Sequence, residues 1–268
     1  MNLKLERRYA HGFTLIEIAI VLVIVGLLLG GLLMPLAAQV EAQRRTETEK
    51  TLEQIKEAMI GFAQVNGRLP CPADPATPAG VAGAGSERVP VLVTTVCTGG
   101  VYGVVPWATL GVSEVDAWGR RFTYRVTSLF SDAINASPQT TGCATIPTNA
   151  SFALCSDGDM LITNGNALGN VTLAATIPAA IVSHGKNGRG AFLPTGQQMT
   201  CPAIPIPPPV LPPPDEVENA ICPGDTAALF ISHGQTSASA PGGEFDDLVT
   251  WIVPAVLKSR MVAAGRLP

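Results

Sequence analysis

One long apolar segment near the N-terminus constrains this chain more than any other feature. Residues 13–33 read FTLIEIAIVLVIVGLLLGGLL and contain a single charged residue, Glu17. A helix rises about 1.5 Å per residue, so this segment would span roughly 30 Å, the thickness of a bilayer core. We therefore expect a transmembrane helix. The alternative, a secretory signal cleaved at Ala37 or Ala38, would need an apolar region longer than the usual length of about 7–15 residues.

Charge is distributed unevenly along the chain. Residues 1–12 carry a net charge of +2 and the whole chain carries −4, which leaves −6 for residues 13–268. Positive charge beside a membrane span favours the cytoplasmic side, so the acidic body is expected to be exported to the periplasm. The densest basic group in that body, Arg120, Arg121 and Arg125, is too small for a nucleic-acid surface. We expect no nucleic-acid partner.

The carboxylate of Glu17 is costly where it stands. A charge deep in a membrane span costs roughly 2.5–3.5 kcal/mol on insertion scales. Either Glu17 lies near the headgroups and stays hydrated, or it pairs with a cation supplied by another molecule. The surrounding residues, GFTLIE at 12–17, follow a short basic leader and precede the long apolar run. This arrangement resembles the processing site of type IV prepilins and type II secretion pseudopilins.

The resemblance implies a processing pathway. A prepilin peptidase would cut between Gly12 and Phe13 and then methylate the new terminal amine of Phe13. Glu17 would become the fifth residue of the mature chain, where the Glu of this family is thought to meet the terminal amine of a neighbouring subunit. The implied partners are the peptidase/methylase, other pilin or pseudopilin subunits, an inner-membrane assembly platform and membrane lipid. The implied location is first the inner membrane, with one span, and then a pilus or pseudopilus filament.

A helical pattern continues beyond the apolar segment. Asn66-Gly67 is a typical helix stop. We expect a leader at 1–12, a helix at 13–66 with its membrane span at 13–33, and a globular head at 67–268. One apolar face recurs at spacings of three and four along the second part of the helix, which we interpret as an amphipathic spine that packs on the head: Leu52, Ile55, Met59 and Phe62.

The head is expected to contain short strands between turns. A helix followed by strands predicts an α+β fold. The resemblance implies a pilin-like arrangement, in which the long helix packs on a small antiparallel sheet with disulfide-bonded loops. Pro254 suits the first turn of a last helix that runs through Ala264. The predicted strands are 122–127, 160–163, 180–183, 228–232 and 248–253.

Two stretches resemble recurring phrases of pseudopilin-like heads. They are PWATLG at 106–111 and DAWGRRFTY at 116–124. Asp116 can brace a turn with its side chain, Trp118 can cover the core, and Gly119 can adopt a positive φ. We expect these residues to maintain the fold and to perform no chemistry.

All six cysteines lie on the exported side of the apolar segment. An even number in this position indicates disulfides formed in an oxidising compartment. The sequential pairs each close a local loop, which favours them, although the sequence leaves the connectivity open. No Cys-x-x-Cys spacing supports a metal site instead. The favoured pairs are Cys71–Cys97, Cys143–Cys155 and Cys201–Cys222.

Residues that could carry catalysis are arranged unfavourably. Ser183-His184 and Ser232-His233 each follow an apolar run, but neighbours on a strand point to opposite faces, so the His cannot activate its own Ser. We expect no enzyme, and a single-span periplasmic enzyme is the alternative. Processing after Gly12 would argue against that alternative.

A late acidic cluster has two interpretations. Some major pseudopilins bind calcium in their late loops, so the resemblance implies a calcium option at Glu244, Asp246 and Asp247, with Asp225 as a further oxygen donor. Calcium needs about six to eight oxygen ligands. Turn capping in contact with solvent is the simpler interpretation. We expect no cofactor other than this optional calcium.

The loops leave two roles open for the whole chain. The sequence favours a structural subunit of a type IV pilus, a type II secretion pseudopilus or a related filament. A proline-rich stretch at 202–214 departs from compact major pseudopilins. It suggests the alternative of a minor tip or adhesin subunit, which would bind a surface or a secreted substrate through its loops.

Overall fold

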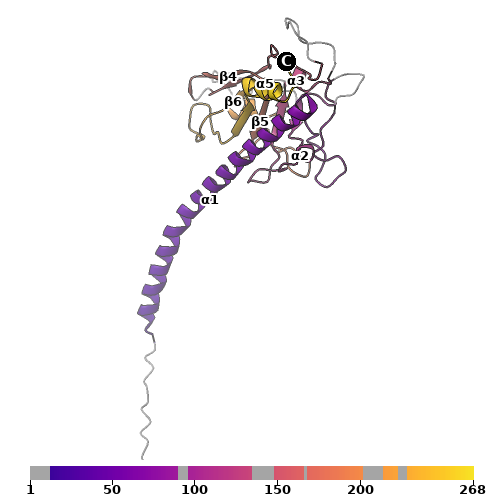
Figure 1. Cartoon of the computed structure of the whole chain (residues 1–268). Helices are drawn as coiled ribbons and strands as arrows, with labels where there is room; N and C mark the ends of the chain where they lie inside the picture. The colour runs from indigo at the N-terminus through magenta and orange to yellow at the C-terminus, as the bar shows by residue number, and fades with distance from the viewer. Residues whose placement is uncertain (1–12, 90–95, 135–147, 166–167, 202–213, 223–227) are drawn as a thin grey trace, which may run out of the picture. The chain divides into compact units, whose positions relative to one another are not determined.

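Figure 1 shows the computed structural model of the chain. The described residues are 13–89, 96–134, 148–165, 168–201, 214–222 and 228–268, without the side chains of 28–36. Gly12, Cys143 and Asp225 lie outside them, so the structure does not bear on the roles expected of these residues. The chain divides into two compact units, Met1–Arg44 and Arg45–Pro268.

The first helix, α1 (Leu15–Asn66), contributes to both units. It ends where the sequence predicts, because Gly67 adopts a φ of 71°, which favours glycine. Its apolar side chains between Phe13 and Leu27 are largely exposed. Within the described residues, no helical stretch has the length and hydropathy that crossing a membrane requires. The transmembrane role of 13–33 stays a prediction.

The larger sheet of the head is entirely antiparallel. Its strand order is β1-β2-β5-β7. The central pairing places Tyr124 opposite Ile181, and Ile181 opposite Thr250 on the other side. The strands are β1 (Tyr102–Val104), β2 (Thr123–Val126), β5 (Ala179–Ser183) and β7 (Leu248–Ile252).

A second, three-stranded sheet has the order β4-β3-β6. β3 and β4 pair antiparallel, whereas β3 and β6 pair parallel. The expectation of one antiparallel sheet is therefore incomplete. β6 comes after a long connection that contains the Cys201–Cys222 loop, and a connection of that length allows a parallel return. The strands are β3 (Met160–Thr163), β4 (Thr172–Ile177) and β6 (Leu229–Ile231).

The remaining helices are short except for the last. α5 (Pro254–Ala263) begins at the predicted proline. The α+β fold is confirmed, and all five predicted strands are present as β2, β3, β5, β6 and β7, with ends shifted by a residue at most. The short helices are α2 (Trp107–Leu110), α3 (Ser128–Ser131) and α4 (Glu216–Asn219).

The head core joins the second half of α1 to the larger sheet. Ile55 and Met59 are fully buried beside Tyr124 of β2 and Met261 of α5 in one hydrophobic cluster. This confirms the predicted amphipathic face with one change. Phe62 is only half-buried, and its ring lies 5.4 Å from the Arg68 guanidinium. Two residues that the spacing did not indicate, Ile60 and Ala63, enter the core instead.

Candidate functional site

The start of α1 is organised by Thr14 and Glu17. The Glu17 carboxylate accepts hydrogen bonds from the Thr14 backbone N–H and hydroxyl, both at 2.8 Å, and the Glu17 N–H donates to the Thr14 hydroxyl at 3.3 Å. This is a capping box, the Thr-x-x-Glu pattern that satisfies free N–H groups at a helix start. The TLIE sequence carries that signal directly, although the sequence reasoning overlooked it.

The capping box gives Glu17 a partner within its own chain. The two expectations for Glu17, hydration near the headgroups or pairing with a foreign cation, therefore do not exhaust its roles. Leu15 and Ile16, between the capping residues, are exposed at 92% and 69%, and Phe13 is exposed at 83%. The Glu17 carboxylate at the capped end is thus surrounded by exposed apolar side chains.

Two disulfides fasten loops of the head. They are Cys71–Cys97 and Cys201–Cys222, with Cα–Cα distances of 5.6 Å and 6.1 Å. Both belong to the sequential set favoured from the sequence. Cys155 is also disulfide-bonded. Its expected partner, Cys143, lies outside the described residues.

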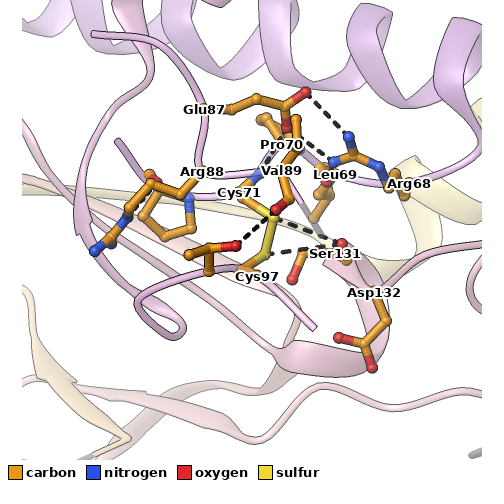
Figure 2. Close-up of a disulfide and its surroundings, with 12 residues drawn as sticks. Arg68, Leu69, Pro70, Cys71, Glu87, Arg88, Val89, Cys97, Ser131 and Asp132 are labelled. Atoms are coloured by element: carbon orange, nitrogen blue, oxygen red, sulfur yellow. Dashed lines mark hydrogen bonds and ion pairs between the residues drawn. A yellow bond between two sulfur atoms is a disulfide. The ribbon is translucent and has the colours of Figure 1, made fainter. Parts of the chain in front are cut away.

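The first disulfide is held against the end of α1 by an ion pair (Figure 2). Arg68 donates to both carboxylate oxygens of Glu87, at 2.9 Å and 3.0 Å. Glu87 in turn accepts the backbone N–H of Cys71 at 3.1 Å. The bridge, the ion pair and the helix end therefore form one connected structure on the head.

The motif around Asp116 has the structural role expected. One carboxylate oxygen accepts the backbone N–H groups of Trp118 at 2.9 Å and Arg120 at 3.0 Å. The other accepts the Ser183 hydroxyl at 2.7 Å. Gly119 has a φ of 81°. Ser183 is thus bound to Asp116 rather than to its neighbour His184, whose Nε2 contacts the Thr123 hydroxyl at 2.7 Å.

Three buried carboxylates converge at the start of β7. Glu216 comes from α4, while Asp246 and Asp247 directly precede β7, and each contributes an oxygen that lies within 4.8 Å of the others. Their residues are exposed by only 1%, 8% and 3%. Glu244, the third member expected from the sequence, instead pairs with Arg189 at 3.4 Å.

The hydrogen bonds around this carboxylate cluster are incomplete. Asn187 donates its side-chain amide to Glu216 at 2.6 Å and its backbone N–H to Asp246 at 2.9 Å. Asn219 donates to Asp247 at 2.9 Å. Among the described residues, the buried Oδ1 of Asp246 has no hydrogen-bond partner. A buried carboxylate oxygen without a partner is costly, so this atom is free to accept a hydrogen bond from water or to bind a cation.

Two arginines supply positive charge near the cluster, Arg120 beside Asp246 and Arg189 beside Glu216. Arg189 reaches Glu216 at 3.4 Å, but its side chain is 45% exposed and is shared with Glu244. Burial raises the pKa of Glu216, Asp246 and Asp247. Repulsion from a neighbouring carboxylate adds to the effect, and for Asp246 that neighbour is Glu244. The carboxyl groups of the cluster therefore hold their protons more readily than carboxyl groups in water.

A fully buried imidazole lies beside the cluster and does not balance its negative charge. The Nδ1 atom of His184 is 3.9 Å from Asp247 Oδ1 and has no hydrogen-bond partner among the described residues. Burial, with the nearby Arg120 charge, lowers the pKa of His184 from 6.5 to about 3, so the ring is neutral near pH 7. A cation or a water molecule between these atoms would satisfy both.

Comparison with known proteins gives one match. Residues 7–33 match the prokaryotic N-terminal methylation motif, the signature of the prepilin-type segments of type IV pilins and pseudopilins. No curated protein and no solved structure matches the chain significantly. The motif supports a pilin-like or pseudopilin subunit that is processed by prepilin peptidase and assembles with other subunits.

Proposed function

We propose that this chain is a structural subunit of a type IV pilus, a type II secretion pseudopilus or a related filament. The N-terminal methylation motif at 7–33 is the observation that carries the proposal. In this proposal the peptidase cuts between Gly12 and Phe13, and the amine of Phe13 is methylated. The mature chain is first anchored in the inner membrane by residues 13–33, with its head in the periplasm. The assembly platform then incorporates it into the filament.

The surface of α1 supports this proposal. Its first residues expose apolar side chains that an aqueous solvent would leave uncovered, and membrane lipid or neighbouring helices can cover them. The head supports a structural role rather than catalysis, because Ser183 is engaged by Asp116 and His184 by Thr123. Disulfides in the head fit an oxidising compartment.

The decisive experiment is the intact mass of the mature chain. We expect a chain that begins at Phe13 and carries one added methyl group. Gly12→Ala should block processing or slow it at least about 10-fold, because a tight peptidase groove accommodates glycine best. Gly26→Ala is the matched control, since among the described residues a methyl group at Gly26 meets no atom within 4 Å apart from its own helix backbone. A mature chain with any other first residue would exclude the proposal.

Position within the filament separates the two forms of this proposal. A subunit found along the whole length of sheared filaments would be a general structural component. Restriction to filament tips would instead indicate the minor tip or adhesin subunit. Immunogold labelling of the head on isolated filaments distinguishes these outcomes.

We also infer that the carboxylate cluster binds a calcium ion. Three converging carboxylates and the buried Asp246 Oδ1, which has no hydrogen-bond partner among the described residues, support this inference. Carboxylate oxygens are the ligands that calcium prefers, and its flexible coordination of about six to eight oxygens suits an irregular cluster completed by water. The ligand set differs from the one expected from the sequence, because Glu216 takes the place of Glu244.

Calorimetric titration of the purified mature chain with calcium tests this inference. Glu216→Gln should weaken binding at least about 10-fold, since it removes one charged ligand. Glu244→Gln should change the affinity little, because Glu244 pairs with Arg189 outside the cluster. An equal loss of calcium affinity in both variants, or no calcium binding by the unsubstituted chain, would refute the calcium site. The filament proposal would be unaffected by either result.

A further inference from the structure

β7 forms one edge of the larger sheet. It pairs with β5 on one side and with no strand on the other. The carbonyl of Pro178, directly before β5, accepts a hydrogen bond at 2.8 Å from the residue that follows β2. The backbone groups of successive strand residues point to alternate sides, so Ile181 points towards β7, where it pairs with Thr250. The N–H and C=O groups of Val249 and Trp251 therefore point out of the sheet.

The outward groups of β7 are open. Within the described residues, no hydrogen bond joins the backbone N–H or C=O of Val249 or Trp251 to a further segment. Two other edges are closed by the chain itself, since the Asn219 side chain binds both backbone groups of Ile231 on β6 and the Ala73 backbone binds β1. β4 pairs with β3 in an irregular register, which disfavours further pairing. An open edge can take up a strand from another chain.

A groove of about 260 Å³ lies along the first part of this edge. Val249 and Trp251 are half-buried against the second hydrophobic cluster, which contains Phe230 of β6. The edge is thus held in place before a partner arrives, and a preformed edge lowers the ordering cost of binding. The lining of the groove includes residues of α1, residues that follow β6, and β7 itself: Arg45, Glu49, Glu53, Ser232, His233 and Leu248–Thr250.

The two faces of this edge favour different side chains. Side chains of neighbouring strands lie next to one another on the same face of a sheet. On the face of Val249 and Trp251, an added strand meets the apolar second cluster. Thr250 is on the other face with Leu248, which belongs to the same cluster as Leu52 of α1. On that face an added strand meets the polar α1 residues of the groove.

The α1 side of the groove favours basic side chains. The side chains of Glu49 and Glu53 are 54% and 61% exposed. Arg45 and Lys56 pair with them along α1, but exposed pairs of this kind contribute little and leave both carboxylates open to a second cation. Residues 13–268 carry a net charge of −6, which also attracts a basic partner.

We propose that the β7 edge binds an extended segment of another protein, which becomes a further strand of the larger sheet. Main-chain hydrogen bonds to Val249 and Trp251 hold the segment. Its alternating side chains, basic towards α1 and apolar on the other face, decide which sequence fits. A second copy of this chain does not supply such a segment, because among the described strands the only basic residue is Arg125 of β2, which lies between β1 and β5. The inference requires neither the calcium site nor the N-terminal processing.

Hydrogen exchange at residue resolution tests this edge. The full chain is kept in micelles of an uncharged detergent at low salt, and the probe is a short capped peptide that alternates lysine and valine. We expect the peptide to slow exchange of the Val249 and Trp251 amides at least about 10-fold. The Thr250 amide, which faces Ile181 within the sheet, should change little. The same peptide with every backbone amide methylated should have no effect, because it has lost its main-chain donors.

Two kinds of variant sharpen the test. Val249→Pro removes an outward N–H, a change that edge strands tolerate, and should abolish the peptide's protection of Trp251 while Thr250 stays protected. Glu53→Lys should weaken binding of the lysine peptide about 2–5-fold and strengthen binding of a glutamate–valine peptide. Glu57→Lys is the matched control, because Glu57 also lies on α1, with a side chain 60% exposed, but does not line the groove.

Three results would overturn the proposal. No slowing at Val249 and Trp251, even at the highest soluble peptide concentration, means that the edge takes up no strand. Equal protection by the methylated peptide means that the probe binds through its side chains alone. Slow exchange at both amides in the chain without peptide, which becomes faster as the protein is diluted, means that a second copy occupies the edge.

Discussion

The first part of α1 exposes the kind of side chain that its second part buries. Leu15 is 92% exposed and most apolar residues up to Leu27 are uncovered, whereas Ile55 and Met59 are completely buried by the head. Both parts belong to one continuous helix. Helical propensity therefore does not distinguish the two parts. They differ in whether the head buries their apolar side chains.

This comparison shows which part of the molecule is self-sufficient. Arg45–Pro268 covers its apolar helix face with its own larger sheet and α5. Among the described residues of Met1–Arg44, the apolar side chains of Phe13–Leu27 are largely exposed, and in the proposed function lipid or other subunits cover them. Burying an apolar side chain is worth about 1.5–3 kcal/mol. This gain stabilises the folded head, and in the proposed function it also favours association of the first part of α1 with lipid or other subunits.

The largest expected effect concerns Glu17, in the part that the proposed function places in the membrane and the filament. Glu17→Val should leave membrane insertion and cleavage intact but lower filament incorporation at least about 10-fold, since the terminal amine of the neighbouring subunit loses its counter-charge. The amount of the variant in sheared filaments, relative to the inner membrane, measures the effect. Incorporation at the level of the unsubstituted chain would refute the ion-pair role.

Glu17→Gln separates the ion pair from the capping box. Glutamine at this position can still cap the Thr14 N–H but carries no charge. A loss of incorporation with glutamine as well as valine would indicate that the charge matters. Normal incorporation with glutamine, together with a defect in Glu17→Val and in Thr14→Val, would assign the effect to helix capping.

The next effect is expected in the self-sufficient part. Met59→Ala should lower the free energy of unfolding of the head by about 2–5 kcal/mol, because it leaves a cavity among fully buried residues. Ile20→Ala removes a similar aliphatic group where the side chain is 54% exposed and should change that free energy by less than about 0.5 kcal/mol. Denaturant titration in detergent measures both. Similar losses of unfolding free energy in the two variants would contradict the division of α1 into an exposed first part and a buried second part.

An effect of similar size is expected for the first disulfide. Replacing Cys71 and Cys97 by serine should cost about 2–5 kcal/mol, since the bridge closes a loop with a sequence separation of 26 residues and is buried beside the end of α1. Calorimetric melting of the oxidised and substituted chains measures it. The native chain should contain no reactive thiol, and thiol labelling without denaturant would contradict the expected compartment.

The smallest effect concerns a partly exposed ion pair of the head. Arg125 donates to both oxygens of Asp159, at 2.6 Å and 2.7 Å. Partial burial acts to raise the pKa of Asp159, but the bonds from Arg125 and Thr127 outweigh it and lower the pKa below the usual 3.8. A lowered pKa stabilises the folded state above about pH 3.8, and the stabilisation is lost as pH falls through the folded-state value.

Asp159→Asn therefore tests this pair through its pH dependence. We expect a loss of about 1 kcal/mol near pH 7 that shrinks towards zero as the pH falls below the usual value of Asp. Unfolding titrations of the two chains across this range measure the difference. A loss that is independent of pH would mean that Asp159 acts through packing and not through its charge.

The sequence by itself determined the local features of the chain. The N-terminal segment is recognised as a methylation motif by its basic leader, GFTLIE and the apolar run. All three are made of residues that lie close together in the sequence. The end of α1 at Asn66 and the start of α5 at Pro254 were predictable for the same reason, because glycine and proline act on their own backbone. Short apolar runs between turns likewise predicted the positions of five strands.

The strands that the sequence missed lack this local signal. β1 is three residues long and contains Gly103, and most side chains of the alanine-rich β4 are exposed. Pairing with β2 and β3 stabilises these segments rather than any pattern of their own. Ile60 and Ala63 likewise enter the core in place of Phe62 because of the shape of the head against α1.

Only the tertiary structure decided the carboxylate cluster. Asp246 and Asp247 are conspicuous as neighbours in the sequence, and Glu244 was grouped with them for that reason. The third carboxylate, Glu216, comes from 30 residues earlier in the chain, through a disulfide-bonded loop. Long-range packing brought it there and directed Glu244 towards Arg189. Spacing along the chain describes a helix end or a processing site, but a site made by converging loops depends on contacts that only the folded head provides.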